Sequence, residues 1–112
     1  MKVNYTEIFK LKQMLEEAGI PFEFNEDYLG EMALFNNIVQ HSYQIKINEN
    51  IDAIQCVGSY GGYQDLIEIM GALTEEEMKN DDVLGFLTAE EVFKRFKYCY
   101  ENNTNVYVEV EK

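Results

Sequence analysis

Side chains that can carry acid–base, nucleophilic or metal chemistry are scarce in this sequence. His41 is the single histidine, and Cys56 and Cys99 are the two cysteines. A neutral-pH general base would have to be His41, but no nucleophile stands beside it in the sequence. Zinc sites take three or four ligands at suitable spacing, which one histidine and two distant cysteines do not supply. We therefore expect no catalytic residue, no metal site and no cofactor.

Acidic residues are abundant but do not form a recognisable reaction centre. The run Glu75–Glu77 lacks the ordered D-x-D-x-D-G pattern of a calcium loop, so it is interpreted as a solvated helix face. Asp65 and Glu68 fall on opposite faces of a predicted strand and cannot act as a paired acid and base. The sequence predicts a protein that is not an enzyme.

The glycine-rich segment "GSYGGYQDLIEIMG", residues 58–71, suggests either a phosphate-binding loop or a tight turn. A phosphate loop runs from a strand into a helix and often contains lysine, whereas here a β-rich segment without lysine follows the glycines. Gly61-Gly62 instead suits a two-residue hairpin turn, in which both central residues need positive φ. That turn would pair Tyr60 with Tyr63, placing Ile54 opposite Ile69 and Cys56 opposite Ile67.

Tyrosines are the most suggestive candidates for recognition, because the chain has eight Tyr and seven Phe but no Trp. Tyrosines at turns or on outward faces serve well as binding anchors. Four are expected in such places: Tyr60, Tyr63, Tyr98 and Tyr107. His41 and Tyr43 are added because they could line a ligand pocket with the hairpin, where aromatic rings would stack on the base of a nucleotide signal. The single arginine, Arg95, weighs against a phosphorylated ligand.

Charge restricts the classes of partner. Nine basic residues face twenty-one acidic ones, giving a formal net charge of −12. Because affinity for nucleic acid comes from clustered Lys and Arg, direct binding to DNA or RNA is not expected. Mimicry of DNA by the acidic surface is a sharper hypothesis, which requires carboxylates in rows. No segment has the apolar length of a signal peptide or membrane span, so we expect a cytoplasmic protein with two reduced core cysteines.

Periodicity predicts two amphipathic helices separated by strands. The first covers residues 5–18, capped by Asn4 with Glu7 and ended at Gly19. The second begins after Thr88, and Thr74 opens a shorter helical turn. Strands are expected at residues 22–24, 32–35, 39–47, 51–59, 64–70 and 106–110.

These elements indicate a single α+β domain over residues 1–112, in which amphipathic helices pack on one face of a twisted antiparallel sheet. The terminal segment "NVYVEV" would be an edge strand. Since edge strands expose unpaired amides, it favours a homodimer with Tyr107 near the contact.

Three segments, "GSYGGYQDLIEIMG", "LTEEE" and "VLGFLTAEEVFKRF", resemble a group of short, mostly uncharacterised proteins encoded by phages and prophages of Gram-positive bacteria. The resemblance covers mainly residues 54–100. It implies a small accessory protein, made in the cytoplasm of the host cell, that binds a host or phage protein, for example as an inhibitor, and catalyses nothing. It assigns no functional residues.

Overall fold

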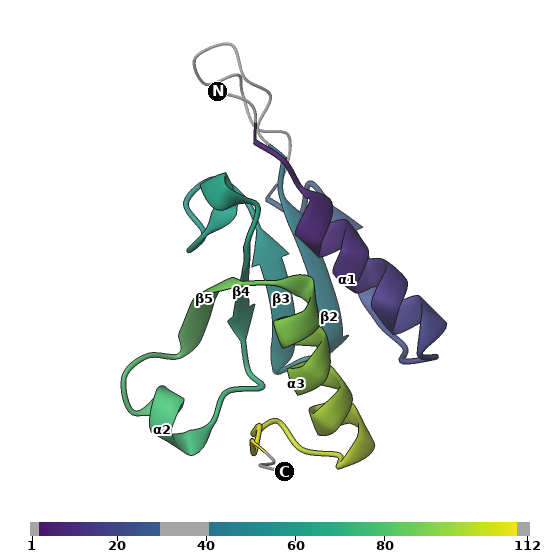
Figure 1. Ribbon diagram of the computed structural model, residues 1–112, viewed down its shortest axis with the longest axis vertical. Coiled ribbons are helices and arrows are strands. Elements are labelled where there is room, and N and C mark those ends of the chain that lie inside the picture. The colour runs from purple at the N-terminus through teal and green to yellow at the C-terminus, as the bar shows by residue number, and fades with distance from the viewer. Residues whose placement is uncertain (1–2, 30–40, 110–112) are drawn as a thin grey trace.

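The computed structural model describes residues 3–29 and 41–109, which form an α+β fold (Figure 1). Five strands make one antiparallel sheet in the order β1-β2-β3-β4-β5, so each strand pairs with the next along the chain. The elements are α1 (Thr6–Glu17), β1 (Glu23–Glu26), β2 (Tyr43–Asn48), β3 (Ile51–Gln55), the 3-10 turn η1 (Gly62–Gln64), β4 (Ile67–Met70), α2 (Glu75–Met78), β5 (Val83–Leu87) and α3 (Ala89–Glu101).

Helices α1 and α3 cover the same face of the sheet, which confirms the predicted architecture (Figure 1). Both present an apolar stripe to the strands. The buried side chains of the two helices are Ile8, Leu11, Leu15, Ala89, Val92, Phe96 and Cys99. The opposite face of the sheet has no helix on it among the described residues, and polar side chains such as Gln44 and Asp52 are bonded to each other there, Nε2 to Oδ2 at 2.8 Å.

Local capping signals are confirmed for two helices and wrong for one. Thr74 with Glu77, and Thr88 with Glu91, form complete capping boxes. The N-cap of α1 is Tyr5, without a side-chain hydrogen bond, instead of the predicted Asn4. The cap comes from elsewhere in the chain: the Asp65 carboxylate accepts from the Glu7 N–H at 3.1 Å and from the Thr6 hydroxyl.

The predicted register between β3 and β4 is wrong by one residue. Ala53, instead of Ile54, lies opposite Ile69, and Ile54 lies opposite Glu68. The two-residue hairpin is absent, because the chain between the strands folds into a longer loop containing η1. The slip places Gln55 in the core, where its Nε2 donates to the carbonyls of Asn4, at 2.8 Å, and Gly62, at 3.0 Å. The donor side of the amide is therefore satisfied, whereas Gln55 Oε1 is buried without a hydrogen-bond partner among the described residues, which costs stability.

The strands predicted for the C-terminal half of the chain also differ from those in the structure. No strand was predicted where β5 (Val83–Leu87) lies. The pairing of β5 with β4 contains a bulge between Ile67 and Ile69, so the residues of β5 do not alternate strictly between the two faces of the sheet. The predicted terminal strand is reduced, within the described residues, to one isolated bridge between Leu73 and Val106. The predicted strand at 32–35 and the start of the one at 39–47 lie outside the described residues.

Arg95 helps to tie the C-terminal segment to the rest of the fold, together with Lys94, whose ammonium lies 5.9 Å from the centroid of the Tyr107 ring and 3.6 Å from the Glu109 carboxylate. The Arg95 guanidinium bonds both oxygens of Glu77, at 2.7 and 2.9 Å, and the Ala72 carbonyl at 3.1 Å. It also lies 4.9 Å from the centroid of the Tyr107 ring. Glu77 is simultaneously the capping-box acceptor for the Thr74 N–H, at 2.8 Å. The Arg95–Glu77 ion pair therefore joins α2 to α3, and Arg95 also contacts the segment around Tyr107.

This ion pair predicts a loss of stability in acid. The Arg95 hydrogen bonds lower the pKa of Glu77 from its ordinary value of 4.5. A carboxyl whose folded-state pKa is depressed stabilises the fold above its unfolded value, and this stabilisation is lost as the pH falls through the folded value. Between about pH 5 and about pH 3, we expect the unfolding free energy of Glu77→Gln to fall less than that of the wild-type protein. Urea denaturation at each pH measures the difference. If the unfolding free energy of Glu77→Gln fell with pH as steeply as that of wild type, the Arg95–Glu77 ion pair would not be the source of the acid sensitivity.

Candidate functional site

The most distinctive surface feature is the contact between the loop after β3 and strand β5. The Phe86 N–H donates to the Tyr60 carbonyl at 3.1 Å, and the Tyr60 N–H donates to Glu68 Oε1 at 2.9 Å. Tyr60 is thereby held to both β4 and β5 through its own backbone. The side chains of Tyr60 and Phe86 are nevertheless 53% and 56% exposed.

Phe86 has an unusual backbone conformation. Its φ is +59°, in the left-handed region that L-residues other than Asn and Asp seldom adopt. Such strain costs of the order of 1–2 kcal/mol and persists where the surrounding structure imposes it. Phe86 gains little from burial in return, because its ring remains mostly in solvent. A strained position that presents an exposed aromatic ring indicates a functional site.

Gly85 allows Tyr60 to approach β5. A Cβ built on Gly85 would overlap the Cβ of Tyr60 and lie 2.9 Å from its carbonyl oxygen. Both neighbours are close to or part of the backbone, so they cannot move aside as the end of a flexible side chain can. Gly85 is therefore a requirement of the Tyr60 contact.

We expect Gly85→Ala to displace Tyr60 while leaving the core in place. The Tyr60–Phe86 backbone hydrogen bond should break, at a cost of about 1–3 kcal/mol in unfolding free energy. Amide hydrogen exchange of Phe86 should accelerate, whereas exchange at Ile69 should be affected only through global stability. Undiminished protection of the Phe86 amide in Gly85→Ala would show that the close approach is not needed.

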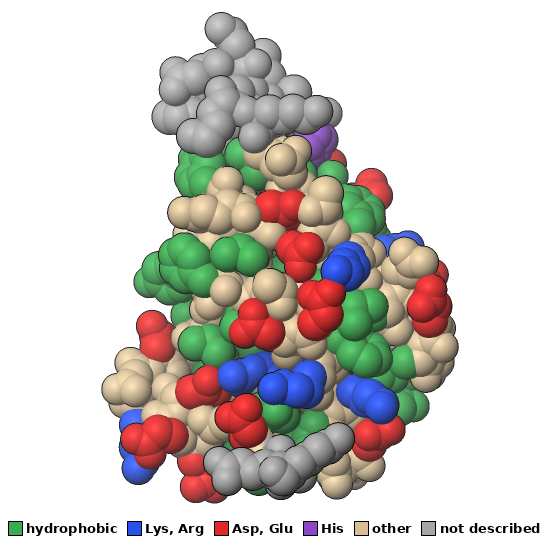
Figure 2. All heavy atoms as spheres, viewed as in Figure 1, with side chains coloured by type: hydrophobic (Ala, Val, Ile, Leu, Met, Phe, Trp, Pro, Cys, Tyr) green, Lys and Arg blue, Asp and Glu red, His purple; other side chains and the backbone are tan. Residues whose placement is uncertain are grey.

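Met70, 46% exposed, extends the exposed apolar area, whereas Tyr63, 45% exposed, lies in η1. Glu68 and Met70 alternate with the buried Ile67 and Ile69, so they face the open side of the sheet. We call Tyr60, Met70 and Phe86 the Tyr60–Phe86 surface. Figure 2 shows hydrophobic side chains protruding at the edge of the molecule beside β5 and the loop after β3.

His41 and Tyr43 lie in a different place, at the β1 side of the sheet. The Tyr43 ring contacts Tyr5, at 4.9 Å between centroids, and Phe9 at 5.0 Å. His41 Nδ1 is 3.2 Å from Asp27 Oδ1. Burial raises the pKa of both Tyr5 and Tyr43. This cluster packs α1 against β2, and no ring contact joins it to Tyr60 or Tyr63 within residues 3–29 and 41–109.

Tyr98 and Tyr107 pack on each other instead of facing outward. Their rings meet edge to face at 5.5 Å, and Tyr107 is only 4% exposed. The expectation that Tyr107 lies on an outward face is therefore wrong. Its N–H is also already bonded to the Leu73 carbonyl at 2.9 Å, so this amide is not free to pair with a second chain.

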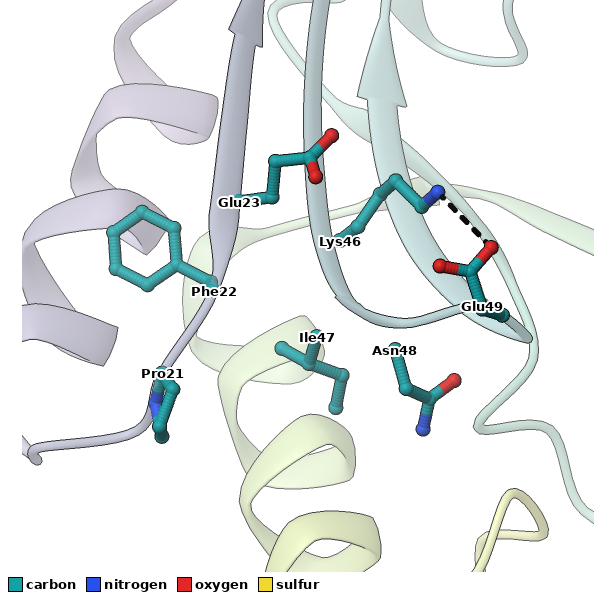
Figure 3. Close-up of a pocket in the computed structure, with 7 residues that line it drawn as sticks. All are labelled: Pro21, Phe22, Glu23, Lys46, Ile47, Asn48 and Glu49. Carbon is teal, nitrogen blue, oxygen red and sulfur yellow. Dashed lines mark ion pairs between the residues drawn. The ribbon is translucent and has the colours of Figure 1, made fainter.

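Two hollows among the described residues lie at the base of the sheet, and neither is lined by Tyr60, Met70 or Phe86. A shallow pocket of about 270 Å³ is formed where β1 begins and β2 ends. Figure 3 shows Phe22 from one side and Ile47 and Asn48 from the other, with the Lys46–Glu49 ion pair at the rim. The ammonium and carboxylate of that pair are 3.6 Å apart.

Within the described part of the chain, no three His, Cys, Asp or Glu side chains are grouped so that they could hold a metal ion. The same residues contain no helix that is both long and apolar enough to cross a membrane. Both cysteines are free and buried, and burial raises the pKa of Cys99 to about 11. No protein-family model, curated protein sequence or solved structure matches the chain.

Sequence patterns identified one of the three residues of the Tyr60–Phe86 surface. Tyr60 was a candidate because of its place beside the glycines, whereas Phe86 and Met70 were not. The available signal was Gly85-Phe86 within the apolar run "VLGFL", because a glycine inside a strand pattern suggests a bulge or a close backbone approach.

Proposed function

We propose that the protein is a non-enzymatic binding protein that engages another protein through the Tyr60–Phe86 surface. The observation that carries the proposal is Phe86, which is held in a strained conformation with its ring 56% exposed. Aromatic side chains that are fixed before binding lose little conformational entropy on association. Tyr and large apolar residues at the centre of an interface commonly supply most of its binding energy.

Charge indicates what the partner should offer. Glu68 lies between Tyr60 and Met70, and the exposed Asp81 and Asp82 lead into β5. A net charge of −12 adds long-range attraction for basic surfaces. The partner that fits is therefore a protein with an apolar pocket bordered by Lys or Arg.

The sequence resemblance supplies the context of the proposal: a small accessory protein of a phage or prophage, acting in the host cytoplasm on a host or phage protein. DNA mimicry is less well supported than recognition through aromatic residues. On the face drawn in Figure 2, basic side chains lie among the acidic ones, so the face is not uniformly acidic. Homodimerisation remains a separate prediction, for which light scattering at low and moderate ionic strength is the measurement.

Affinity purification with quantitative mass spectrometry tests the proposal. The wild-type protein and Tyr60→Ala are used as baits in lysate of a Gram-positive bacterium. We expect a stoichiometric partner whose recovery falls at least about tenfold with Tyr60→Ala, which corresponds to about 1.4 kcal/mol. Tyr100→Ala, which removes an exposed tyrosine from α3, is the matched control and should retain the partner. Equal recovery by Tyr60→Ala and wild type would contradict the proposed surface.

The alternative, a binder of a nucleotide signal, has weaker support. It required His41 and Tyr43 to line a pocket with Tyr60 and Tyr63. Tyr43 instead packs against Phe9 of α1, and His41 lies against Tyr43 with its Nδ1 3.2 Å from Asp27 Oδ1. The lone arginine is engaged with Glu77. Thermal-shift measurements with nucleotides at millimolar concentration separate this alternative from the leading proposal, because a protein-binding surface predicts no stabilisation.

A further inference from the structure

A second feature, independent of the Tyr60–Phe86 surface, is a polar groove at the base of the sheet. Its volume is about 550 Å³, and it lies between the β2–β3 turn and the chain that follows α3. We call it the asparagine groove. Four of its lining residues are asparagines: Asn48 and Asn50 from the turn, and Asn103 and Asn105 after the helix.

Local chemistry explains part of this composition. Asn48 Oδ1 accepts from the Asn50 N–H at 2.7 Å, as in a common asparagine turn. Asn103 ends α3 with a φ of +50°, a conformation that asparagine tolerates better than most residues. Turn and cap preferences do not require the two segments to face each other. The structure nevertheless brings them together, because Asn48 Nδ2 donates to Asn105 Oδ1 at 3.1 Å.

Several polar groups of the groove remain available to a ligand. Among the described residues, the side-chain amides of Asn50 and Asn103 have no hydrogen-bond partner, nor does the hydroxyl of Tyr100. Each carboxamide offers both a donor and an acceptor. A ligand that donates and accepts at neighbouring atoms, as vicinal hydroxyl groups do, matches such a lining.

The charges around the groove select a neutral ligand. Its lining contains neither Lys nor Arg, and its one charged residue is Glu49, whose carboxylate faces Lys46 at 3.6 Å. Phosphorylated or carboxylated ligands would meet a single cation, Lys46 of the adjoining pocket, which is already paired with Glu49. The net charge of −12 further disfavours anions.

An aromatic platform completes the groove. The Tyr100 side chain is 49% exposed on α3 and lines the same hollow. An aromatic ring beside polar groups presents an apolar face together with a polar rim, which suits the C–H face of a sugar ring. Ile47, Asn48 and Glu49 also line the neighbouring pocket of about 270 Å³, which is drawn in Figure 3. Because the two hollows share these residues, they adjoin. From these observations we propose that the asparagine groove binds a neutral saccharide longer than one ring.

The test uses the full-length protein and a panel of neutral oligosaccharides, namely maltotriose, cellotriose and chitotriose, followed by ¹H–¹⁵N NMR titration. Backbone and side-chain amides of Asn50, Asn103 and Asn105 should shift in a saturable manner with at least one saccharide. Asn103→Gly should weaken that binding about tenfold, which corresponds to loss of one to two hydrogen bonds. Because glycine accepts the conformation at Asn103 without strain, the variant should keep its fold. Asn80→Gly, at an exposed turn outside the groove, should bind as wild type does.

Four outcomes would overturn the proposal. The first is no saturable shift with any saccharide of the panel, and the second is an equal response to glycerol. The third is binding that Asn103→Gly and Tyr100→Ala leave unchanged while both variants remain folded. A groove that responds instead to a neutral tripeptide but not to saccharides would also contradict it.

Discussion

Replacing Arg95 with alanine should lower the free energy of unfolding by about 2–4 kcal/mol. The side chain of Arg95 is 13% exposed and that of Glu77 is 27% exposed, so their mutual attraction is only partly screened. The substitution leaves the Glu77 carboxylate half-buried without its cation and leaves the Ala72 carbonyl without its donor. It also removes the guanidinium from the Tyr107 ring, although the Lys94 ammonium remains 5.9 Å from the ring centroid. Urea denaturation followed by circular dichroism measures the effect.

The neighbouring Lys94 provides a matched control. Its ammonium lies 3.6 Å from the Glu109 carboxylate, but the side chain of Lys94 is 59% exposed. Because exposed ion pairs contribute little, Lys94→Ala should cost no more than about 1 kcal/mol. If Arg95→Ala were as mild as Lys94→Ala, Arg95 would not be holding the C-terminal segment in place.

Replacing Asp65 with alanine should cost about 2–3 kcal/mol, combining loss of a helix cap with backbone strain. Asp65 caps α1 from the loop before β4, through the Thr6 hydroxyl and the Glu7 N–H. Its φ of +59° is also unfavourable for alanine. The effect extends to α3, because the Glu7 carboxylate accepts from the Ala89 N–H at 2.8 Å. Losing the Asp65 cap should therefore loosen the start of both helices.

Asp65→Asn separates the two contributions. Asparagine tolerates the left-handed conformation and retains one carbonyl oxygen as an acceptor, so most of the stability should return. Hydrogen exchange should show faster opening of the first turn of α1 in Asp65→Ala only. A loss as large in Asp65→Asn as in Asp65→Ala would show that the negative charge, and not the cap geometry, stabilises α1.

The features that could be predicted from the sequence are those decided by near neighbours. The capping boxes at Thr74 and Thr88 each join residues three apart, and the helices follow a local 3.6-residue period. The α+β class follows from the order of these elements. The cap of α1 could not be found in this way, because Asp65 is 58 residues from Glu7 along the chain.

The β3–β4 register was missed for a related reason. Alternation alone favoured Ile54 and Cys56 as the inward residues, whereas Ile51, Ala53 and Gln55 face the core. A buried glutamine becomes acceptable only when the Asn4 and Gly62 carbonyls are known to lie within reach. Phe86 could not be identified from the sequence for the same reason. Its N–H is hydrogen-bonded to the Tyr60 carbonyl, a contact between residues far apart in the chain.

The most direct test of the central claim is to measure stability and partner capture together in Phe86→Asn. Asparagine relieves the left-handed strain and gives up only a largely exposed ring. The account predicts unfolding free energy equal to or above that of wild type, by up to about 1 kcal/mol, with at least about tenfold less partner recovered. Val108→Asn is the control for the loss of an exposed apolar side chain, because Val108 is 54% exposed. This variant should capture the partner as wild type does. A Phe86→Asn variant that is destabilised by about 2 kcal/mol yet captures the partner as wild type does would show that Phe86 serves the fold, and the account would be contradicted.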